Sequence, residues 1–325
     1  MTWLVTGGAG YIGAHVVRAF RDDGIDVVVI DDLSSGKAEF VPDGVPFVRA
    51  NLLDGKAVRE ALDGAEGVVH LAGFKYAGVS VERPLHTYTQ NVTAMVSLLE
   101  AMAEQSVRNI VFSSSAGVYG TPRDEVVTED TAPDPQSPYG ESKLIGEWLL
   151  RDEAAAADLH HTSLRYFNVV GSGDPTVYDA SPYNLFPIVC DLLTQGKTPQ
   201  IYGTDHPTPD GTSVKDYVHV ADLARAHVAA ARALEAGKTL ERVYNLGSGT
   251  GTSVRQIMDA ARRVTGIDFT PAEGPRRPGD PSRVVANGDL AARDLGWRNT
   301  YTVDQMFATA WEAWPSSTPS SSTPS

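Results

Sequence analysis

Thr2-Trp3-Leu4-Val5-Thr6-Gly7-Gly8-Ala9-Gly10-Tyr11-Ile12-Gly13 stands at the start of the chain. Its first five residues form a short apolar run, which is typical of a buried strand. A helical apolar spacing through Val16, Val17 and Phe20 follows the glycines. A strand, a glycine-rich turn and a helix in this order predict the first unit of a doubly wound α/β sheet.

The glycines of this turn match two spacings of a phosphate-binding loop. Gly8, Gly10 and Gly13 match G-x-G-x-x-G, and Gly7, Gly10 and Gly13 match the wider G-x-x-G-x-x-G. Glycines allow a tight turn and let the backbone approach a pyrophosphate, and the helix that follows offers unpaired N–H groups. Because the motif lies between a strand and a helix, it predicts a dinucleotide site.

An acidic pair, Asp31 and Asp32, ends the next apolar run. Asp31 lies 18 residues beyond Gly13, near the spacing of the carboxylate that accepts the adenine-ribose hydroxyls. An acid at this position would repel a 2′-phosphate. The sequence therefore predicts NAD rather than NADP.

Strand and helix patterns then alternate. We expect strands at Pro46–Arg49, Gly67–Leu71, Asn109–Ser113 and Thr162–Phe167, and helices at Asp54–Leu62, Pro84–Glu104 and Pro138–Ala157. This alternation predicts a Rossmann-type, doubly wound parallel sheet, whose ligands bind at the carboxyl ends of the strands. That rule selects Ala72–Lys75, Ser113–Ser115 and Tyr166–Asn168 as segments that face the site.

The pattern changes after Asn168, where glycine, proline and aspartate become frequent. Short strands are expected at Gln200–Tyr202, Val243–Leu246 and Asp268–Pro271, and helices at Val220–Leu234, Ser253–Val264 and Thr302–Trp311. We expect an NAD-binding domain at 1–168 and a smaller α/β substrate domain at 169–314. Residues 214–246 should return to the first domain, with 214–220 as part of its main sheet. Residues 315–325 are only Pro, Ser and Thr, which predicts a disordered tail.

Composition excludes several classes of protein. The chain has 325 residues and a net charge of −14, which disfavours nucleic acid and anionic membranes as partners. Cys190 is the only cysteine, so no internal disulfide can form, and its apolar surroundings predict a core residue. We find no stretch of membrane-spanning length, no room for a signal peptide before Thr2 and no metal-ligand spacing. These features predict a cytoplasmic enzyme or binding protein without a metal.

Ser137–Lys143 carries the predicted chemistry. Tyr139 and Lys143 lie four residues apart at the start of a helical apolar spacing, so both side chains should rise from one helix face. A phenol has a pKa of about 10, and a fixed ammonium nearby favours the phenolate. The same pair is also an ordinary feature of helix surfaces, so the interpretation depends on the rest of the chain.

With these motifs in hand, the chain resembles the extended short-chain dehydrogenase/reductase family and, within it, the UDP-glucose (UDP-galactose) 4-epimerases. The resemblance runs from the first strand to about Trp314. Beside the glycine turn and Ser137–Lys143, the stretches that carry it are His70–Lys75, Gln90–Val92, Phe112–Gly120, Arg165–Asn168, Tyr202–Asp205, Asp210–Thr212, Asp216–Leu223, Tyr244–Gly247 and Arg276–Asp280.

The resemblance implies NAD-dependent epimerisation at C4 of a UDP-hexose through a transient 4-keto sugar. It implies that Ser115 bonds the sugar O4 and Tyr139, that Tyr139 is the acid/base, and that Lys143 holds the nicotinamide ribose and lowers the Tyr139 pKa. The implied cofactor residues are Gly7, Gly10, Tyr11, Ile12, Gly13, Asp31, Asp32, Asn51, Leu52, Leu71, Ala72, Gly73, Lys75, Asn91, Tyr139, Lys143 and Tyr166. The implied substrate residues are Lys75, Ser115, Tyr139, Asn168, Asn184, Leu185, Gln200, Ile201, Tyr202, Lys215, Arg277, Asp280 and Val284. The family also implies a homodimer through the helices at Pro84–Glu104 and Pro138–Ala157.

Three positions depart from the family's pattern. Lys215 stands where the family usually has arginine, so a bidentate phosphate contact becomes a point charge, for which Arg283 could compensate. Asn51 stands where an acid often meets the adenine amino group, and its amide oxygen can still accept that bond. Val284 falls where some members carry a tyrosine, which leaves room for a 2-acetamido group and predicts activity on UDP-N-acetylhexosamines as well.

Other readings remain open. Dehydratases of the family place an acid pair where this chain has Ala116 and Gly117. A uronate epimerase or decarboxylase should want a further charged group near the sugar, and we identify none. A different NAD-dependent nucleotide-sugar epimerase or dehydrogenase, or a 4-epimerase for another nucleotide's sugar, stays possible. A non-catalytic NAD-sensing protein is disfavoured because Ser115, Tyr139 and Lys143 are all retained.

Overall fold

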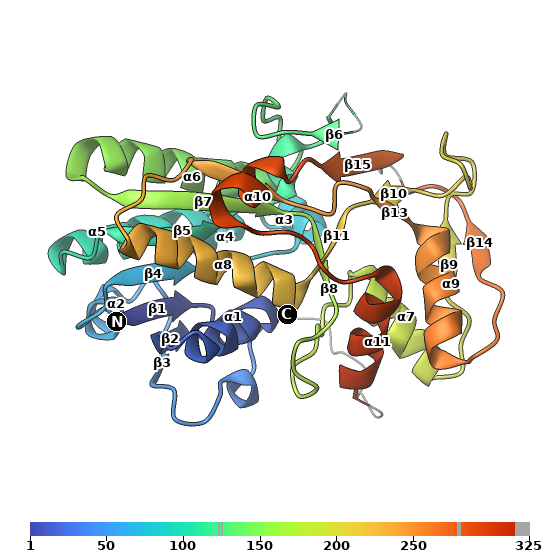
Figure 1. Ribbon diagram of the computed structural model, residues 1–325, viewed down its shortest axis with the longest axis horizontal. Coiled ribbons are helices and arrows are strands. Elements are labelled where there is room, and N and C mark those ends of the chain that lie inside the picture. Colours follow the sequence, from blue (N-terminus) through green and yellow to red (C-terminus); the bar gives the residue numbers. More distant parts are fainter. Residues whose placement is uncertain (123, 125, 278–280, 316–325) are drawn as a thin grey trace.

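A seven-stranded parallel sheet forms the first layer of the molecule (Figure 1). The structure is a computed structural model, and it describes residues 1–122, 124, 126–277 and 281–315. The strand order is β12-β7-β5-β4-β1-β2-β3, which is that of a doubly wound nucleotide-binding sheet and confirms the predicted fold class. The bounds are β1 Thr2–Thr6, β2 Asp26–Asp31, β3 Phe47–Arg49, β4 Gly67–His70, β5 Asn109–Ser113, β7 His160–Tyr166 and β12 Val243–Leu246.

Helices cover both faces of this sheet (Figure 1). One face carries α1 (Tyr11–Asp22), α8 (Val220–Glu235) and α10 (Asp289–Leu295), and the other carries α2 (Gly55–Ala61), α5 (Ala94–Glu104) and α6 (Pro138–Ala157). Successive side chains of a strand point to opposite faces. Trp3 and Val5 accordingly join the core under α1 and α8, whereas Leu4 joins the core under α2 and α5.

A second layer lies beyond the carboxyl ends of these strands (Figure 1). Its helices α7 (Leu185–Thr194), α9 (Val254–Thr265) and α11 (Val303–Ala313) share a separate core that contains Phe186, Met258 and Phe307. Cys190 lies in this core as predicted, and burial raises the pKa of its thiol to about 12. The remaining strands form three small sheets. One has four strands in the order β13 (Thr252–Ser253), β10 (Val214–Lys215), β15 (Arg283–Ala286) and β6 (Val126–Val127). The other two are pairs, β11 (Tyr217–His219) with β8 (Asn168–Val170) and β14 (Ala272–Gly274) with β9 (Gln200–Tyr202).

The helix expected over Pro84–Glu104 is interrupted. After α3 (Ala77–Glu82), the chain forms α4 (Pro84–Tyr88), then a π-helical turn at Thr89–Thr93, and then α5. Two short 3₁₀ helices complete the described elements, Ala38–Phe40 and Ala116–Tyr119. The π turn has a role in the site, because it carries Asn91.

The expectation that residues 214–220 return to the main sheet is wrong. β10 pairs with β13 and β15, and β11 pairs with β8. The place beside β7 is taken by β12, so within residues 214–246 it is α8 and β12 that return to the first layer. The domain limits 1–168 and 169–314 stay a prediction.

The strand expected at Asp268–Pro271 is also misplaced. β14 begins at Ala272, whose N–H donates to the carbonyl of Pro199 at 2.9 Å. Pro271 has no N–H to offer to such a ladder, which explains why the strand starts after it. Asp280 and residues 316–325, including almost all of the predicted tail, lie outside the described residues.

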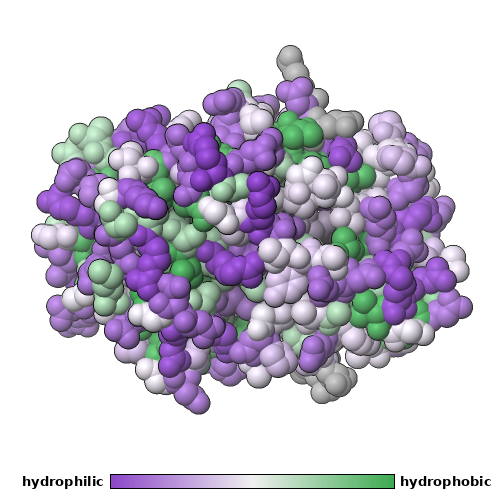
Figure 2. Space-filling view, in the orientation of Figure 1, coloured by the Kyte–Doolittle hydropathy of each residue, from purple (hydrophilic) through white to green (hydrophobic). Residues whose placement is uncertain are grey.

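The surface shown in Figure 2 is mostly hydrophilic, with hydrophobic residues scattered among the polar ones. This agrees with the charged, acidic composition of the chain. Within the described ranges, no helix is both long and apolar enough to cross a membrane.

Candidate active site

The strand order reverses between β1 and β4. Thr6, the last residue of β1, connects the carboxyl ends of these two strands through hydrogen bonds. Its Oγ1 lies 2.8 Å from His70 Nδ1 and accepts the N–H groups of Leu71 and Ala72 at 3.2 Å each. Gly7 follows with φ +71°, and a Cβ on it would lie 2.8 Å from Ala72 N. Doubly wound sheets bind ligands at such a reversal.

The glycine turn fits the pyrophosphate of a dinucleotide. A Cβ on Gly13 would lie 2.1 Å from the carbonyl oxygen of Gly7, so only glycine permits this close return of the chain. Gly10 caps α1 without a side-chain hydrogen bond. The first N–H groups of α1 and its positive dipole end therefore remain available to an anion.

The two acids at the end of β2 bond to the glycine turn and to Asn51. Asp31 Oδ2 accepts the N–H of Ala9 at 3.0 Å, and Oδ1 accepts the N–H of Leu33 at 2.8 Å. The Asp31 pKa lies above its ordinary value, because burial raises it more than these two bonds lower it. Asp32 Oδ2 accepts a bond from Asn51 Nδ2 at 2.7 Å. The Asn51 oxygen accepts the N–H of Leu53 at 3.0 Å, and its second lone pair is free to accept the predicted bond from adenine.

The structure brings Ser115, Tyr139 and Lys143 together. Ser137 caps α6 by accepting the N–H of Gly140 at 3.2 Å, and this places Tyr139 in the first turn. The side chain of Ser115, which follows β5, is hydrogen-bonded to Tyr139. Lys143 Nζ lies 5.9 Å from the centre of the Tyr139 ring and donates to the Ser113 carbonyl at 2.9 Å.

Burial dominates the proton affinities of this trio. It raises the pKa of Tyr139, and the hydrogen bond from Ser115 lowers it. Burial also lowers the pKa of Lys143 to about 8, against the carboxylate of Glu147, which raises it. Burial and then the Lys143 charge lower the pKa of His70 to about 3. The Tyr139 pKa therefore lies above its ordinary value, because burial outweighs the bond from Ser115. The expected lowering by Lys143 stays a prediction.

Asn91 shapes the loop after β4. Its Oδ1 accepts the N–H of Phe74 at 2.6 Å, and its Nδ2 donates to the Phe74 carbonyl at 3.0 Å and to Ser142 Oγ at 2.8 Å. A Cβ on Gly73 would lie 2.8 Å from Asn91 Oδ1. Asn91 therefore fixes the loop that carries Lys75 and joins it to α6.

The remaining predicted cofactor residues differ in their exposure. The Lys75 side chain is exposed beside the ring of Tyr76. Tyr166 ends β7, and its phenol is hydrogen-bonded to Ser113. The side chain of Leu52 is buried in the core under α2 and α5, so only its backbone can face a cofactor.

Part of the predicted substrate set lies where the second layer meets the first. Asn168 is exposed on β8 and donates to the Asp216 carbonyl at 2.9 Å. Asn184 donates to Asp179 Oδ2 at 2.7 Å and directly precedes Leu185, the first residue of α7. The rings of Tyr76 and Tyr183 meet at 5.0 Å, which brings the Lys75 loop next to this segment.

The other predicted substrate residues lie on the small sheets. The Arg277 guanidinium stacks 4.4 Å above the Tyr202 ring. Lys215 and Val284 are register partners on β10 and β15, and Lys215 Nζ also donates to the Pro281 carbonyl at 3.0 Å. Gln200 and Ile201 lie on β9, but the Ile201 side chain is only 1% exposed, so it can offer only backbone groups.

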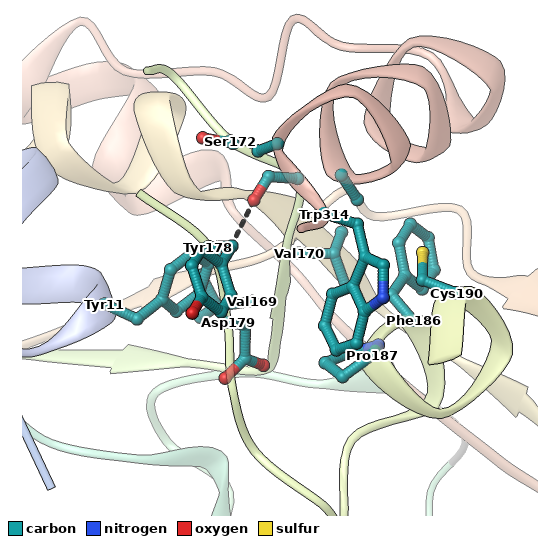
Figure 3. Close-up of a pocket in the computed structure, with 13 residues that line it drawn as sticks. Tyr11, Val169, Val170, Ser172, Tyr178, Asp179, Phe186, Pro187, Cys190 and Trp314 are labelled. Atoms are coloured by element: carbon teal, nitrogen blue, oxygen red, sulfur yellow. Dashed lines mark hydrogen bonds between the residues drawn. The ribbon is translucent and has the colours of Figure 1, made fainter. Parts of the chain in front are cut away.

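A small cavity lies at the joint between the layers (Figure 3). Tyr11 lines it from α1 and donates to the Gly171 carbonyl at 2.6 Å, and Phe186, Cys190 and Trp314 line it from the other side. It has room for about one water molecule. It is therefore a gap in the joint and not a substrate site.

A buried polar network, which was not predicted from the sequence, lies behind Ser115, Tyr139 and Lys143. Glu147 accepts bonds from Ser114 Oγ at 2.6 Å and from Arg165 Nε at 2.9 Å and Nη2 at 2.6 Å. Arg165 Nη1 donates to the Tyr119 hydroxyl at 2.9 Å, which donates to Asn245 Oδ1 at 2.7 Å. The available signal was the position of Glu147, four residues after Lys143, on the buried face of the predicted helix.

A comparison with known protein families shows which family the chain belongs to. Residues 3–247 match the model of the NAD dependent epimerase/dehydratase family. The chain belongs to this family. Its glycine turn is accordingly that of an NAD-dependent member, and the prediction of NAD as the cofactor is confirmed.

Several known proteins resemble the chain over nearly its full length. The UDP-glucose 4-epimerase of Corynebacterium glutamicum is 42% identical over 306 residues, covering 93% of this chain and 92% of that protein. The crystal structure of UDP-glucose 4-epimerase from Brucella ovis in complex with NAD superposes with a TM-score of 0.92 at 38% identity, covering 95% and 97% of the two chains. The UDP-Glc/GlcNAc 4-epimerase of Campylobacter jejuni superposes with a TM-score of 0.84 at 32% identity, covering 96% and 98%.

Proposed function

We propose that this protein is a UDP-glucose 4-epimerase, an isomerase that interconverts UDP-glucose and UDP-galactose through a transient 4-keto sugar. The observation that carries the proposal is the hydrogen bond between Ser115 and Tyr139, with Lys143 on the same helix face. The names of the relatives support the choice of reaction.

Tyr139 is the acid/base of the proposed reaction. Its phenolate oxygen takes the proton from the sugar O4 and later returns it. Ser115 positions this phenolate oxygen through a hydrogen bond. The Lys143 ammonium donates to the Ser113 carbonyl and lies one helical turn from Tyr139, where its charge favours the phenolate. The glycine turn and the acids at the end of β2 would hold NAD, which when bound would supply the hydride acceptor and then the donor and would add a positive ring that favours the phenolate.

Inversion at C4 requires the nucleotide to be held tightly and the hexose loosely. We assign the diphosphate to Lys215 and Arg277, and the uridine to Asn168, Asn184, Leu185 and the Gln200–Tyr202 strand. Asp280, which lies outside the described residues, would meet the ribose. The Arg277 guanidinium lies over the ring of Tyr202. Arg283 donates to the Thr250 carbonyl at 3.1 Å and directly precedes Val284. These cations supply the positive pocket that an acidic protein needs for an anionic substrate.

Purification without added cofactor tests the proposal. We expect bound NAD that is not consumed, turnover of UDP-galactose in a coupled assay, and a loss of about 10²–10⁴-fold in kcat in Tyr139→Phe with NAD still bound. Unchanged turnover in Tyr139→Phe would remove Tyr139 as the acid/base. NAD binding without turnover by the wild type would favour the non-catalytic reading.

The site also supports N-acetylated substrates. Val284 lies beside Lys215 on β15, and a valine leaves more room above the sugar than the tyrosine of some family members. We propose activity on UDP-N-acetylglucosamine and UDP-N-acetylgalactosamine, as in the name of the Campylobacter jejuni neighbour. Good turnover of UDP-galactose with none of UDP-N-acetylglucosamine would reject this extension.

We further propose a homodimer through α4, α5 and α6. Apolar side chains remain exposed on this group of helices, with Leu85 at 81%, Trp148 at 47% and Val96 at 37%. A two-fold axis would bury the same patch on both copies. Light scattering should give twice the mass of one chain, and Leu85→Glu with Trp148→Glu should give a monomer. A wild-type monomer at micromolar concentration contradicts the proposal.

A further inference from the structure

The Glu147–Arg165 pair lies directly behind the groups that are proposed to move the proton. Tyr139, Lys143 and Glu147 follow one another at four-residue intervals on α6, so they lie along one face of the helix. The side chains of Glu147 and Arg165 are 7% and 5% exposed. A buried carboxylate is costly unless it is fully paired, and this one accepts three hydrogen bonds.

Each partner of Glu147 belongs to an element that carries part of the site. Ser114 lies between Ser113, whose carbonyl holds Lys143, and Ser115, which holds Tyr139. Arg165 is the neighbour of Tyr166 at the end of β7. One carboxylate thus ties α6 to the ends of β5 and β7.

We infer that Glu147 is a positioning residue for the epimerisation: it fixes α6 against Ser113–Ser115 and keeps Lys143 protonated through its charge. The inference rests on the proposed function, because it explains how the Tyr139–Lys143 pair is set for that chemistry. Glu147 itself meets neither substrate nor cofactor. It acts through Ser114 and through Lys143.

Whether the charge of Glu147 keeps Lys143 protonated depends on which other charged groups surround Lys143. The titratable and charged groups near its contact with Ser113 are Tyr139 and Glu147 on α6, His70 on β4, Arg165 and Tyr166 on β7, and His227 on α8. Burial lowers the pKa of His70 to about 3 and of His227 to about 4, so both are neutral at pH 7. Burial raises the pKa of both tyrosines. Among these described groups, Glu147 is the one that opposes the loss of the Lys143 proton.

Glu147→Gln tests the charge while it keeps an oxygen for Ser114. Without the carboxylate, the pKa of Lys143 falls below its value of about 8. The alkaline limb of the kcat profile should therefore move to lower pH by about one unit, with little change in KM. The shift should also appear in a ¹³C-NMR titration of the Lys143 ammonium, which reads the charge coupling without turnover.

Ser114→Ala tests the positioning, because it removes the bond to β5 and leaves the charge. We expect a drop of about tenfold in kcat with the alkaline limb unmoved. Glu153→Gln, six residues further along α6, is the matched control and should leave the profile and the titration unchanged.

A second variant covers the case in which Glu147→Gln does not fold because Arg165 is left unpaired. Glu147→Met with Arg165→Met replaces the pair by apolar side chains, which buried ion pairs commonly tolerate. It should fold, keep NAD and show a smaller downward shift of the limb, because the Arg165 charge that disfavours the ammonium is removed together with the carboxylate. A wild-type profile and a wild-type Lys143 titration in folded Glu147→Gln, or in the double variant if the single one does not fold, overturn the inference. A wild-type protein without epimerase activity would instead overturn the proposed function, and the titration would still decide the charge coupling.

Discussion

At the residue scale, the cofactor site depends on places where a side chain cannot be tolerated. One such place is Gly13, where an added Cβ would lie 2.1 Å from Gly7 O and 2.8 Å from the Cα of Gly8. Both neighbours are backbone atoms, so the clash cannot be relieved by turning a side chain. The turn must open, and it then no longer presents the N–H groups of α1 to a pyrophosphate.

Gly13→Ala is therefore expected to fold but to purify without NAD, because the pyrophosphate loop is displaced. Gly24→Ala is the matched control at the other end of α1. Gly24 has φ +75° with open space around it, so this variant should lose about 1 kcal/mol of stability and keep NAD. Absorbance of the released nucleotide after heating measures the occupancy. Full NAD in Gly13→Ala would contradict the assigned role of the turn.

At the element scale, the predicted strands and helices of the first layer lie within about two residues of the observed ones, whereas α3 and α10 were not predicted. Pro138–Ala157 is a helix as expected, with Ser137 as its cap, and Asn109–Ser113 is a strand. This helix and this strand could be predicted because a proline in the first turn, a serine cap and apolar runs are local sequence signals. The π turn at Thr89–Thr93 was not predictable, since its one-residue register shift is invisible to a 3.6-residue period.

That register shift turns Asn91 towards the Phe74 backbone and Ser142. Asn91→Ala leaves these buried groups without partners and should cost about 1–3 kcal/mol of stability. Activity should fall further than stability alone explains, because the Lys75 loop loses its anchor. Asn109→Ala, at the opposite end of the sheet, removes one bond to the Glu66 carbonyl and should leave kcat and KM unchanged. Equal effects of the two variants on kcat would contradict this role.

At the scale of the whole molecule, the sequence predicted two layers but not how they join. The way the two layers join is set by contacts between segments that lie far apart in the sequence. Arg18 on α1 donates to Asp174 at 2.7 Å and to the Phe40 carbonyl at 2.7 Å. Lys37 after β2 donates to the Tyr178 hydroxyl and lies 4.3 Å from the centre of that ring. No local pattern marks such pairs, and the same holds for Glu147 and Arg165.

The Arg18–Asp174 pair makes stability depend on pH. Burial raises the Asp174 pKa, but bonds from Thr176 and Arg18 outweigh it and lower the pKa to about 2. A lowered carboxyl pKa stabilises the fold above the ordinary value of 3.8, and this stabilisation is lost as the pH falls towards 2. Asp174→Asn should therefore cost about 1–2 kcal/mol at pH 7, after allowance for partial exposure.

Denaturant unfolding checks this prediction. The difference between wild type and Asp174→Asn should be constant from pH 7 to about 5 and should shrink as the pH falls below about 4. Asp158→Asn is the control, because its pair with Arg108 is exposed at 3.6 Å and should contribute little. A difference that does not change with pH contradicts the assignment.

The last strand of the large sheet is supplied from far along the chain. β12 joins β7 only after Val243, and α8 covers α1 only after Val220. During synthesis, a nascent chain that has left the ribosome up to Asn168 carries an open sheet edge and a bare apolar face over Val16, Val17 and Phe20. The nucleotide-binding half therefore cannot finish folding vectorially. It must wait for translation of residues 220–246, and until then this apolar face stays exposed to water.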